Sequence, residues 1–399
     1  MAIDPHQLLD PHVVQDPYPF YDEVRREAPV WRVGGSNVFL VTAFEPLAEA
    51  ALRVNDFSSV LTALLYKDAD GLPATLPIEL GEPTLATADP PVHTLHKQLM
   101  FPRFVTKRME LLEEELVGFT NARLDETETH ADFDFMTAVA GAVPIHAISA
   151  LIGFRNSDEQ MLLQTAYDSV ELTGGFKTLE ELGRARLRTD EISAWMNAQL
   201  DERDGRSATD VLDAVKAAIN GGQLTKGEGV TTMLTLLAAG GESTASLLGA
   251  AVRILADRPD IQAVLQKDLA LLPAFIDEAL RLESPFRHHL RSVPRDTELA
   301  GVPVPAGSAV MLMWGAANRD PAVFENPAEL VLGRPQQHVT FGRGIHQCLG
   351  RALARLEARI VLTAMLQRQR FPKVVADQEP EWEYSLQVRR YRRLPLTWN

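Results

Sequence analysis

The chain has 399 residues, of which 46% are hydrophobic and 23% are charged, and its formal net charge is −15. This hydrophobic fraction supports a large core and excludes a disordered or fibrous protein. A single cysteine excludes intrachain disulfides and cysteine-cluster metal sites, and the acidic balance argues against a protein that binds nucleic acid.

The N-terminal residues and the longest apolar stretch both argue against a membrane protein. Residues 1–24 are polar and proline-rich, with aspartates where a signal peptide needs basic and then apolar side chains. Residues 231–256 are apolar, but they include Glu242, two glycines and several hydroxyl side chains that lipid tolerates poorly. We expect a cytoplasmic protein without a membrane span.

The first part of the chain mixes short elements. Residues 19–27 predict a helix, and residues 31–42 predict strands around the turn signal Gly34-Gly35. Residues 58–89 show little periodicity and contain many glycine, proline and threonine residues, which predicts a long loop.

The middle of the chain, from Pro91 to Glu283, predicts mostly helix. Breaks are expected at glycines near residues 153, 174–175, 204–205 and 221–222. Strand signals with proline turns follow between Pro285 and Pro335.

The C-terminal part contains a glycine-rich loop, residues 341–350, followed by an amphipathic helix. No internal repeat or flexible linker is visible in the sequence. We therefore expect one domain over residues 1–399, mainly α with small β-sheets (α+β). The apolar stripe of the last helix consists of Leu349, Leu353, Leu356 and Ile360.

The glycine-rich loop places Cys348 just before that helix. Unpaired N–H groups and the positive end of the helix dipole favour a thiolate there, which is the form that binds metal. Gly342 and Gly344 permit close approach of a flat cofactor. Two alternatives remain open for the cysteine: a buried inert thiol, or a zinc ligand together with His346, although structural zinc needs about four ligands.

The pattern Phe-Gly-x-Gly-x-His-x-Cys-x-Gly is complete in residues 341–350 and resembles the haem-binding signature of the cytochrome P-450 superfamily, the haem-thiolate monooxygenases. The resemblance implies a triangular helical prism around haem b, with Cys348 as the axial thiolate ligand of the iron. Phe341 would shield the sulfur, and His346 would approach a haem propionate. The cofactor-binding residues of the loop are then Phe341, Gly342, His346, Cys348 and Gly350.

Two further segments resemble haem-supporting motifs of the family. Glu278 and Arg281, spaced i, i+3, match its Glu-x-x-Arg helix, where a structural role with a later arginine is implied; Arg319 is the candidate. Read alone, such a pair is usually a solvated surface pair of small worth.

Residues 89–97 resemble the helix that contacts the haem edge, with His93 and Lys97 as candidates for propionate binding. Arg291 matches another propionate-binding arginine. The family often has arginine where Lys97 stands, so a point charge replaces a bidentate contact. Without the resemblance, His93 could equally be a helix-surface histidine.

A central helix over about residues 229–256 resembles the helix that crosses the distal haem face. Gly240 is expected to allow close approach of the cofactor, and Glu242, Ser243 and Thr244 are the candidate catalytic residues, relaying protons through water. The family's threonine is serine here, so it remains open whether Ser243 or Thr244 supplies the hydroxyl. Both hydroxyls could instead bond back to a helix carbonyl.

The resemblance implies oxidation of a small apolar organic substrate by dioxygen. The pocket would include a lid region over about residues 156–200 and the candidates Phe286, Arg287 and Leu290. Arg287 is expected either to recognise a polar or anionic group of the substrate or to pair with an acid or a haem propionate.

The electrons must come from a separate partner, because no flavin or nicotinamide domain is visible. An iron–sulfur ferredoxin with its reductase is expected, or else a flavodoxin, docking on a local charge of +6 between Arg334 and Phe371. A peroxide-driven peroxygenase and a non-catalytic haem sensor are the alternatives. The arginines counted are Arg334, Arg343, Arg351, Arg355, Arg359, Arg368 and Arg370, against Glu357.

Overall fold

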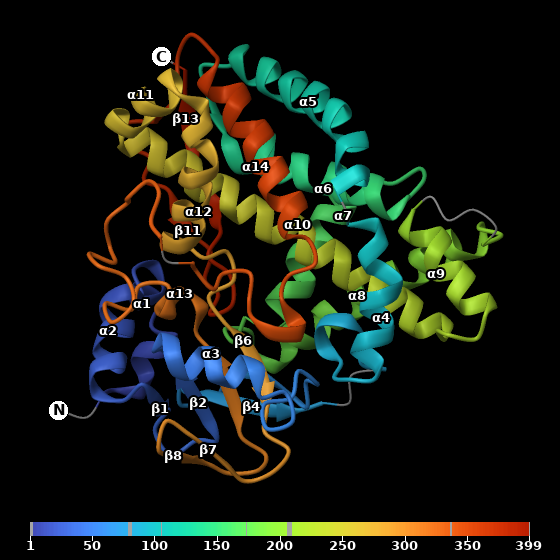
Figure 1. The fold of residues 1–399 in the computed structure, drawn as a ribbon, viewed down its shortest axis with the longest axis vertical. Coiled ribbons are helices and arrows are strands. Elements are labelled where there is room, and N and C mark those ends of the chain that lie inside the picture. Colours follow the sequence, from blue (N-terminus) through green and yellow to red (C-terminus); the bar gives the residue numbers. More distant parts are fainter. Residues whose placement is uncertain are drawn as a thin grey trace.

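The computed structural model describes residues 3–78, 82–104, 106–172, 174–205, 210–335 and 337–398. Helices fill most of the molecule, and the strands gather mainly at the end where the N-terminus lies (Figure 1). The long helix α10 (Lys226–Asp257) crosses the middle and extends slightly beyond the expected 229–256. It packs against α6 (Ala142–Ile152), α7 (Glu159–Glu171) and α14 (Arg351–Leu366).

The other helices surround this centre. Their limits agree with the expected glycine breaks: α6 ends at Gly153, whose φ of 91° places it in the left-handed region, and α9 ends before Gly221. The remaining α-helices are α1 (Pro11–Gln15), α2 (Tyr18–Glu27), α3 (Phe44–Leu52), α4 (Val92–Met100), α5 (Thr106–Glu128), α8 (Leu179–Asp201), α9 (Val211–Asn220), α11 (Pro259–Lys267), α12 (Leu272–Leu282) and α13 (Trp314–Ala317).

Capping side chains explain where three long helices begin. Asp158 accepts hydrogen bonds from the first amides of α7. Thr178 and Thr225 each form a reciprocal capping box, with Glu181 at the start of α8 and with Glu228 at the start of α10. The expected lid region, residues 156–200, therefore consists of α7 and α8; Thr173 between them lies outside the described residues.

The largest sheet has four strands in the order β1-β2-β9-β6, with β2 and β9 parallel and the other neighbours antiparallel. Its members are β1 (Val30–Arg32), β2 (Val38–Val41), β6 (His289–Ser292) and β9 (Ala309–Leu312). A three-stranded sheet joins β10 (Lys373–Val374), β13 (Pro395–Thr397) and β5 (Asp132–Asp134).

Three two-stranded sheets complete the β structure of the described residues. One of them corrects the expected loop at residues 58–89: Ala63–Lys67 and Pro73–Pro77 pair as an antiparallel hairpin, because Leu65 becomes buried when the strands pair; residues 79–81 lie outside the described part. The pairs are β3 (Ala63–Lys67) with β4 (Pro73–Pro77), β7 (Thr297–Leu299) with β8 (Val302–Val304), and β11 (Glu381–Trp382) with β12 (Tyr391–Arg393).

Helix α10 connects two hydrophobic cores. Its first half, up to Leu237, packs with α6, α8 and α9, whereas its second half, from Ala245, packs with α12 and the C-terminal half of α14. The segment 238–244 lies between these cores, so the polar residues of α10 occupy the transition. No helix among the described residues is long and apolar enough to cross a membrane.

Candidate haem site

The Cys348 loop has a backbone that only its glycines allow. Gly342 and Gly344 have φ values of 69° and 72°, in the left-handed region. A Cβ atom on Gly344 would lie 3.1 Å from the carbonyl oxygen of Ala51, so α3 also requires glycine there. The amide of Cys348 donates to Phe341 O at 2.8 Å, which closes the loop, and Gly350 is the N-cap of α14.

The protein surrounds Cys348, yet the residue keeps an exposed surface. Burial raises the pKa of the Cys348 thiol, and backbone N–H groups of Gly350 and Arg351 oppose that rise. The expected bias towards thiolate from the helix start is therefore outweighed by desolvation. A bound metal ion would deprotonate the thiol, because coordination favours the thiolate.

Four basic side chains from three segments gather beside this loop; we call His93, Lys97, Arg291 and His346 the basic cluster. The His93 and His346 rings lie 4.3 Å apart, and Lys97 donates to the Ile345 carbonyl. Burial lowers the pKa of Arg291 to about 10 and that of His346 to about 3.

The basic cluster lacks acidic partners among the described residues, apart from Asp89, which already accepts from Ser58 and Ser59. Within the part of the chain that the structure describes, Arg291 bonds only the carbonyl of Leu290, and Nε2 of His346 is buried without a partner. Arg291 stays charged, and a buried cation without a counter-charge is costly. The donors present fit a ligand that carries carboxylates, as haem b does. His289 adds a nearby ring that sequence reasoning assigned to no role; it accepts from Trp314 Nε1 at 2.7 Å.

The glycine pair of α10 serves helix packing. A Cβ atom on Gly240 would lie 3.1 Å from Ile148, and one on Gly241 would lie 2.7 Å from Ile145. Both neighbours belong to α6, so these glycines let α6 lie close to α10, and the expected role of Gly240 in cofactor approach stays a prediction. The exposed residue in this part of α10 is Ala239.

The two hydroxyl candidates point in different directions. Ser243, one helical turn after Ala239 and partly exposed, donates to the Ala239 carbonyl at 2.6 Å. Thr244 is buried and bonds the carboxyl group of Glu357 on α14. Thr244 therefore bonds away from the face of Ser243, and its catalytic role stays a prediction. The alternative of back-bonding holds for Ser243 in this structure.

Glu242 is fully buried and pairs with Arg390, whose Nε lies 3.0 Å from Glu242 Oε1. Burial raises the pKa of Glu242 to about 8, and the guanidinium limits the rise. The second carboxyl oxygen has no partner. A carboxyl group with a pKa near neutrality can both give and take a proton under working conditions. Arg390 was missed by sequence reasoning because its run of arginines carries no motif.

The Glu278–Arg281 pair is buried, which excludes a solvated surface pair. Arg281 donates to Glu278 at 2.7 and 2.9 Å and to three backbone carbonyls. The third member is Arg334, 3.1 Å from Glu278, and the expectation of Arg319 is wrong. Arg319 instead pairs with Glu283 at 3.1 Å and stacks on Tyr18, because its loop lies beside α2.

The three substrate candidates have different surroundings. Phe286 packs with Val170, Ala238 and Val388, which come from α7, α10 and the C-terminal segment. Arg287 is buried and donates to the carbonyl of Val14, so neither expected role, substrate recognition or pairing with an acid or propionate, is supported. Leu290 packs in a separate core with the N-terminal segment.

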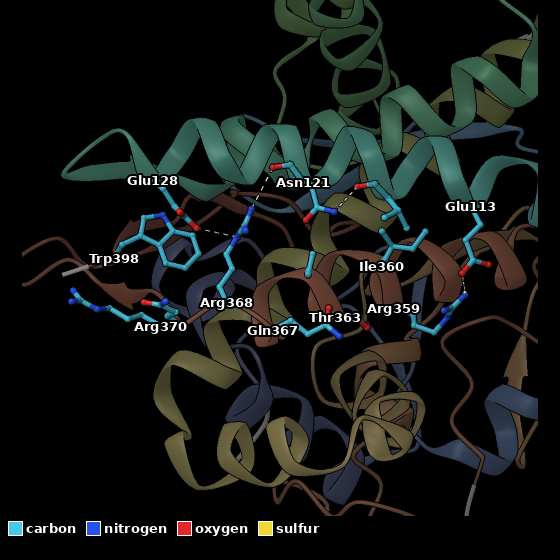
Figure 2. A pocket seen from close by; sticks show the side chains of 13 residues that line it. Glu113, Asn121, Glu128, Arg359, Ile360, Thr363, Gln367, Arg368, Arg370 and Trp398 are labelled. Atoms are coloured by element: carbon cyan, nitrogen blue, oxygen red, sulfur yellow. Dashed lines mark hydrogen bonds and ion pairs between the residues drawn. The ribbon is translucent and has the colours of Figure 1, made fainter.

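The local charge of +6 does not produce an equally basic surface. Four of the seven arginines pair with acids that other helices contribute: Arg334 with Glu278, Arg355 with Asp277, Arg359 with Glu113, and Arg368 with Asp125 and Glu128. Within the described residues, Arg343, Arg351 and Arg370 have no such partner. A hollow of about 810 Å³ between α5 and α14 is lined by several of these pairs, and Figure 2 shows Arg359 and Arg368 reaching acids of α5.

Comparison with known proteins agrees with this geometry. The profile of the Cytochrome P-450 family matches residues 177–388. Cytochrome P-450 144 of Mycobacterium tuberculosis is 39% identical over 95% of this chain and 88% of its own length. The 6-deoxyerythronolide B hydroxylase of Saccharopolyspora erythraea is 30% identical over 95% of each chain.

Solved structures extend the likeness to the whole fold. The crystal structure of CYP109E1 from Bacillus megaterium in complex with testosterone matches with a TM-score of 0.87 and 27% identity, covering 98% of this chain and all of the other. The cofactor of this family is haem b with an axial cysteine thiolate, and Cys348 is the single cysteine available. The chain belongs to the cytochrome P-450 family of haem-thiolate monooxygenases.

Proposed function

We propose that this oxygenase acts as a single cytoplasmic domain and oxidises a small apolar organic compound with electrons from an iron–sulfur ferredoxin. One oxygen atom enters the substrate, and the other leaves as water after taking up electrons and protons. The observation that carries the proposal is the combination of Cys348 just before α14 with a basic cluster whose one nearby acid, within the described residues, is Asp89, which is already bonded by Ser58 and Ser59.

The haem supplies the reductive cleavage of dioxygen when it is bound. Cys348 would ligate its iron, and Phe341, whose carbonyl accepts from the Cys348 amide at 2.8 Å, would shield the sulfur. Arg291, Lys97 and the two histidines of the basic cluster would hold the propionates through charge-assisted hydrogen bonds.

Proton supply is assigned to α10. Glu242 carries a proton at neutral pH because burial raises its pKa to about 8. Ser243 is adjacent in sequence, and its hydroxyl lies on the side of the exposed Ala239. A water molecule would connect the two groups, since Glu242 itself is fully buried beside Arg390.

The hydrophobic cluster around Phe286 favours an apolar substrate. Phe286, Val170, Ala238 and Val388 form one hydrophobic cluster at the meeting point of three elements. Burial of apolar substrate surface would therefore provide the binding free energy, at roughly 25 cal/mol per Å².

The partner surface combines apolar and basic side chains around the cysteine loop. Leu52 is 59% exposed, and its side chain lies beside Gly344; the neighbouring Ile345 is 36% exposed. Arg343 and Arg351 are exposed on the same loop and at the start of α14. An acidic ferredoxin with an apolar contact residue fits this surface, and a flavodoxin is the second candidate.

Turnover with labelled dioxygen tests the proposal. With a ferredoxin, its reductase and an apolar compound, the product should gain one labelled oxygen atom. Ile345→Asp should raise the KM for ferredoxin several-fold, whereas Val264→Asp, at an exposed valine of α11, should not. Equal turnover with peroxide alone would favour the peroxygenase, and no turnover with any electron donor would favour a haem sensor.

A further inference from the structure

Arg390 lies where three parts of the chain meet. It precedes β12, and its side chain is buried. Its Nε donates to Glu242 of α10 at 3.0 Å, and Nη2 donates to Glu383 at 3.2 Å. Nη1 donates to the carbonyl of Tyr391, so every nitrogen of the guanidinium is engaged.

The same guanidinium also contacts α7. Its central carbon lies 3.9 Å from the centre of the Tyr167 ring, which is a cation–π contact. Burial raises the pKa of Tyr167 to about 12, so the ring stays neutral at working pH. One side chain thus touches the buried acid of α10 and the first helix of the lid region together.

The loop after α7 is attached to the same C-terminal segment. The amide of Leu386 donates to the Gly174 carbonyl at 2.8 Å. A Cβ atom on Gly174 would lie 2.9 Å from Ser385, and one on Gly175 would lie 3.0 Å from Leu386, so both glycines are needed for this approach. A displacement of α7 would therefore also disturb the segment that carries Arg390.

We propose that Arg390 is a positioning residue that holds Glu242 for proton transfer towards Ser243. Because Arg390 also contacts the Tyr167 ring, its position at Glu242 depends on the position of α7. The inference deepens the proposed function and rests on the proton-donor role of Glu242. When Glu242 gives up its proton, the nearby cation stabilises the carboxylate that remains. With α7 displaced, Arg390 loses the Tyr167 ring, and proton supply would slow until the lid closes.

The groups that face Glu242 set the direction of the pH effect. Arg390 lowers the pKa of Glu242, while Glu171 of α7 and Glu383 of the C-terminal segment raise it, and burial raises it most. Lys177 pairs with Glu171 at 3.2 Å, and Asp134 of β5 acts on Tyr167. Removal of the Arg390 cation must therefore raise the pKa of Glu242 further.

Substitution at Arg390 gives the first test in the holoenzyme. The quantity measured is the amount of product formed per electron consumed, as a function of pH. In Arg390→Met, the alkaline limb of this profile should move to higher pH, and the product formed per electron at neutral pH should fall about tenfold. Arg390→Lys keeps the cation and should keep the limb near its original pH. Arg392→Met, at an exposed arginine of the same strand, is the matched control and should change neither value.

Substitution at Tyr167 tests the connection to the lid. Tyr167→Phe retains the ring and should behave as the wild type, whereas Tyr167→Leu should reproduce a weaker form of the Arg390→Met shift. Hydrogen–deuterium exchange at the C-terminal end of α7 should increase in Tyr167→Leu and in Arg390→Met, and this readout does not require turnover.

The outcomes distinguish failure of the positioning role of Arg390 from failure of the proton-donor role of Glu242. If Glu242→Gln lowers the product ratio but Arg390→Met, Arg390→Lys and Tyr167→Leu leave the pH limb unchanged, the positioning role is overturned and the proposed function stands. If Glu242→Gln itself has no effect, the proton-donor role fails, and the inference fails with it. A uniform loss of activity at an unchanged pH limb would show that Arg390 is merely structural.

Discussion

Buried charge is arranged in opposite ways in two regions of this molecule. Around Glu278, cations and a carboxylate meet at 2.7 to 3.1 Å, and backbone carbonyls take the remaining donors. Around Arg291 and His346, basic side chains gather with only Asp89 as an acid among the residues that the structure describes, and that carboxylate is already bonded by serines.

The difference separates structural charge from charge that a ligand must complete. A paired buried cluster can stabilise the apoprotein, because each charge has its partner in the chain. A cluster with unmatched donors stabilises only a complex that brings carboxylates. We therefore propose that the basic cluster is a haem-binding feature, whereas the Glu278 cluster belongs to the scaffold.

The largest expected effect is a loss of stability when the buried Glu278 cluster is broken. Glu278→Gln leaves Arg281 and Arg334 buried without a carboxylate, which should lower the free energy of unfolding by about 3–5 kcal/mol. Urea denaturation of the apoprotein measures this value. Arg319→Gln breaks only its own pair with Glu283, so its loss should add to that of Glu278→Gln in the double variant, and a non-additive loss would refute the assignment of Arg334.

Arg291→Leu should weaken haem binding without lowering the stability of the apoprotein. The apoprotein should lose no stability, because an unmatched buried cation is removed, while haem affinity should fall about 30-fold through loss of a charge-assisted bond worth roughly 2 kcal/mol. Haem transfer to apomyoglobin measures the affinity. Strong destabilisation of the apoprotein would contradict the idea that the cluster awaits a ligand.

A smaller effect should distinguish the two hydroxyl groups of α10. Ser243→Ala should lower product formed per electron about tenfold, since its hydroxyl is on the exposed face. Thr244→Ala should leave that ratio unchanged and cost about 1 kcal/mol of stability through its bond to Glu357. The reverse result would return the catalytic role to Thr244.

The smallest effect concerns the pH dependence of stability. Burial raises the pKa of Glu357 well above its ordinary value of 4.5, so its contribution is fully present below that pH and is lost as pH rises. Glu357→Gln should therefore reduce the slope of unfolding free energy against pH above 4.5 by up to about 1.4 kcal/mol per pH unit. An unchanged slope in denaturation series at several pH values would mean that Glu357 is not buried as an acid.

The features that could be predicted from sequence are local. The cysteine loop, the helix after it and the glycine breaks each depend on a few consecutive residues whose backbone needs are specific, such as the left-handed Gly342 and Gly153. The Glu-x-x-Arg pair is also local, and its two members bond as the spacing implies.

Partners that are distant in sequence could not be predicted in the same way. Arg319 and Arg334 are equally plausible partners for Glu278 until the loop between them is folded. The local count of +6 fails for the same reason, since α5 and α12 contribute neutralising acids. On α10, a rotation of about 100° per residue sends Ser243 and Thr244 to different faces, which a motif alone cannot resolve.

The absorption spectrum of the reduced holoenzyme with carbon monoxide tests most directly whether Cys348 ligates the haem iron. Ligation by Cys348 predicts the red-shifted Soret band of a thiolate haem, and Cys348→Ser should abolish that band while Arg392→Met retains it. An imidazole-like spectrum in the wild type, or a thiolate band that survives in Cys348→Ser, would contradict the assignment of Cys348 as the haem ligand.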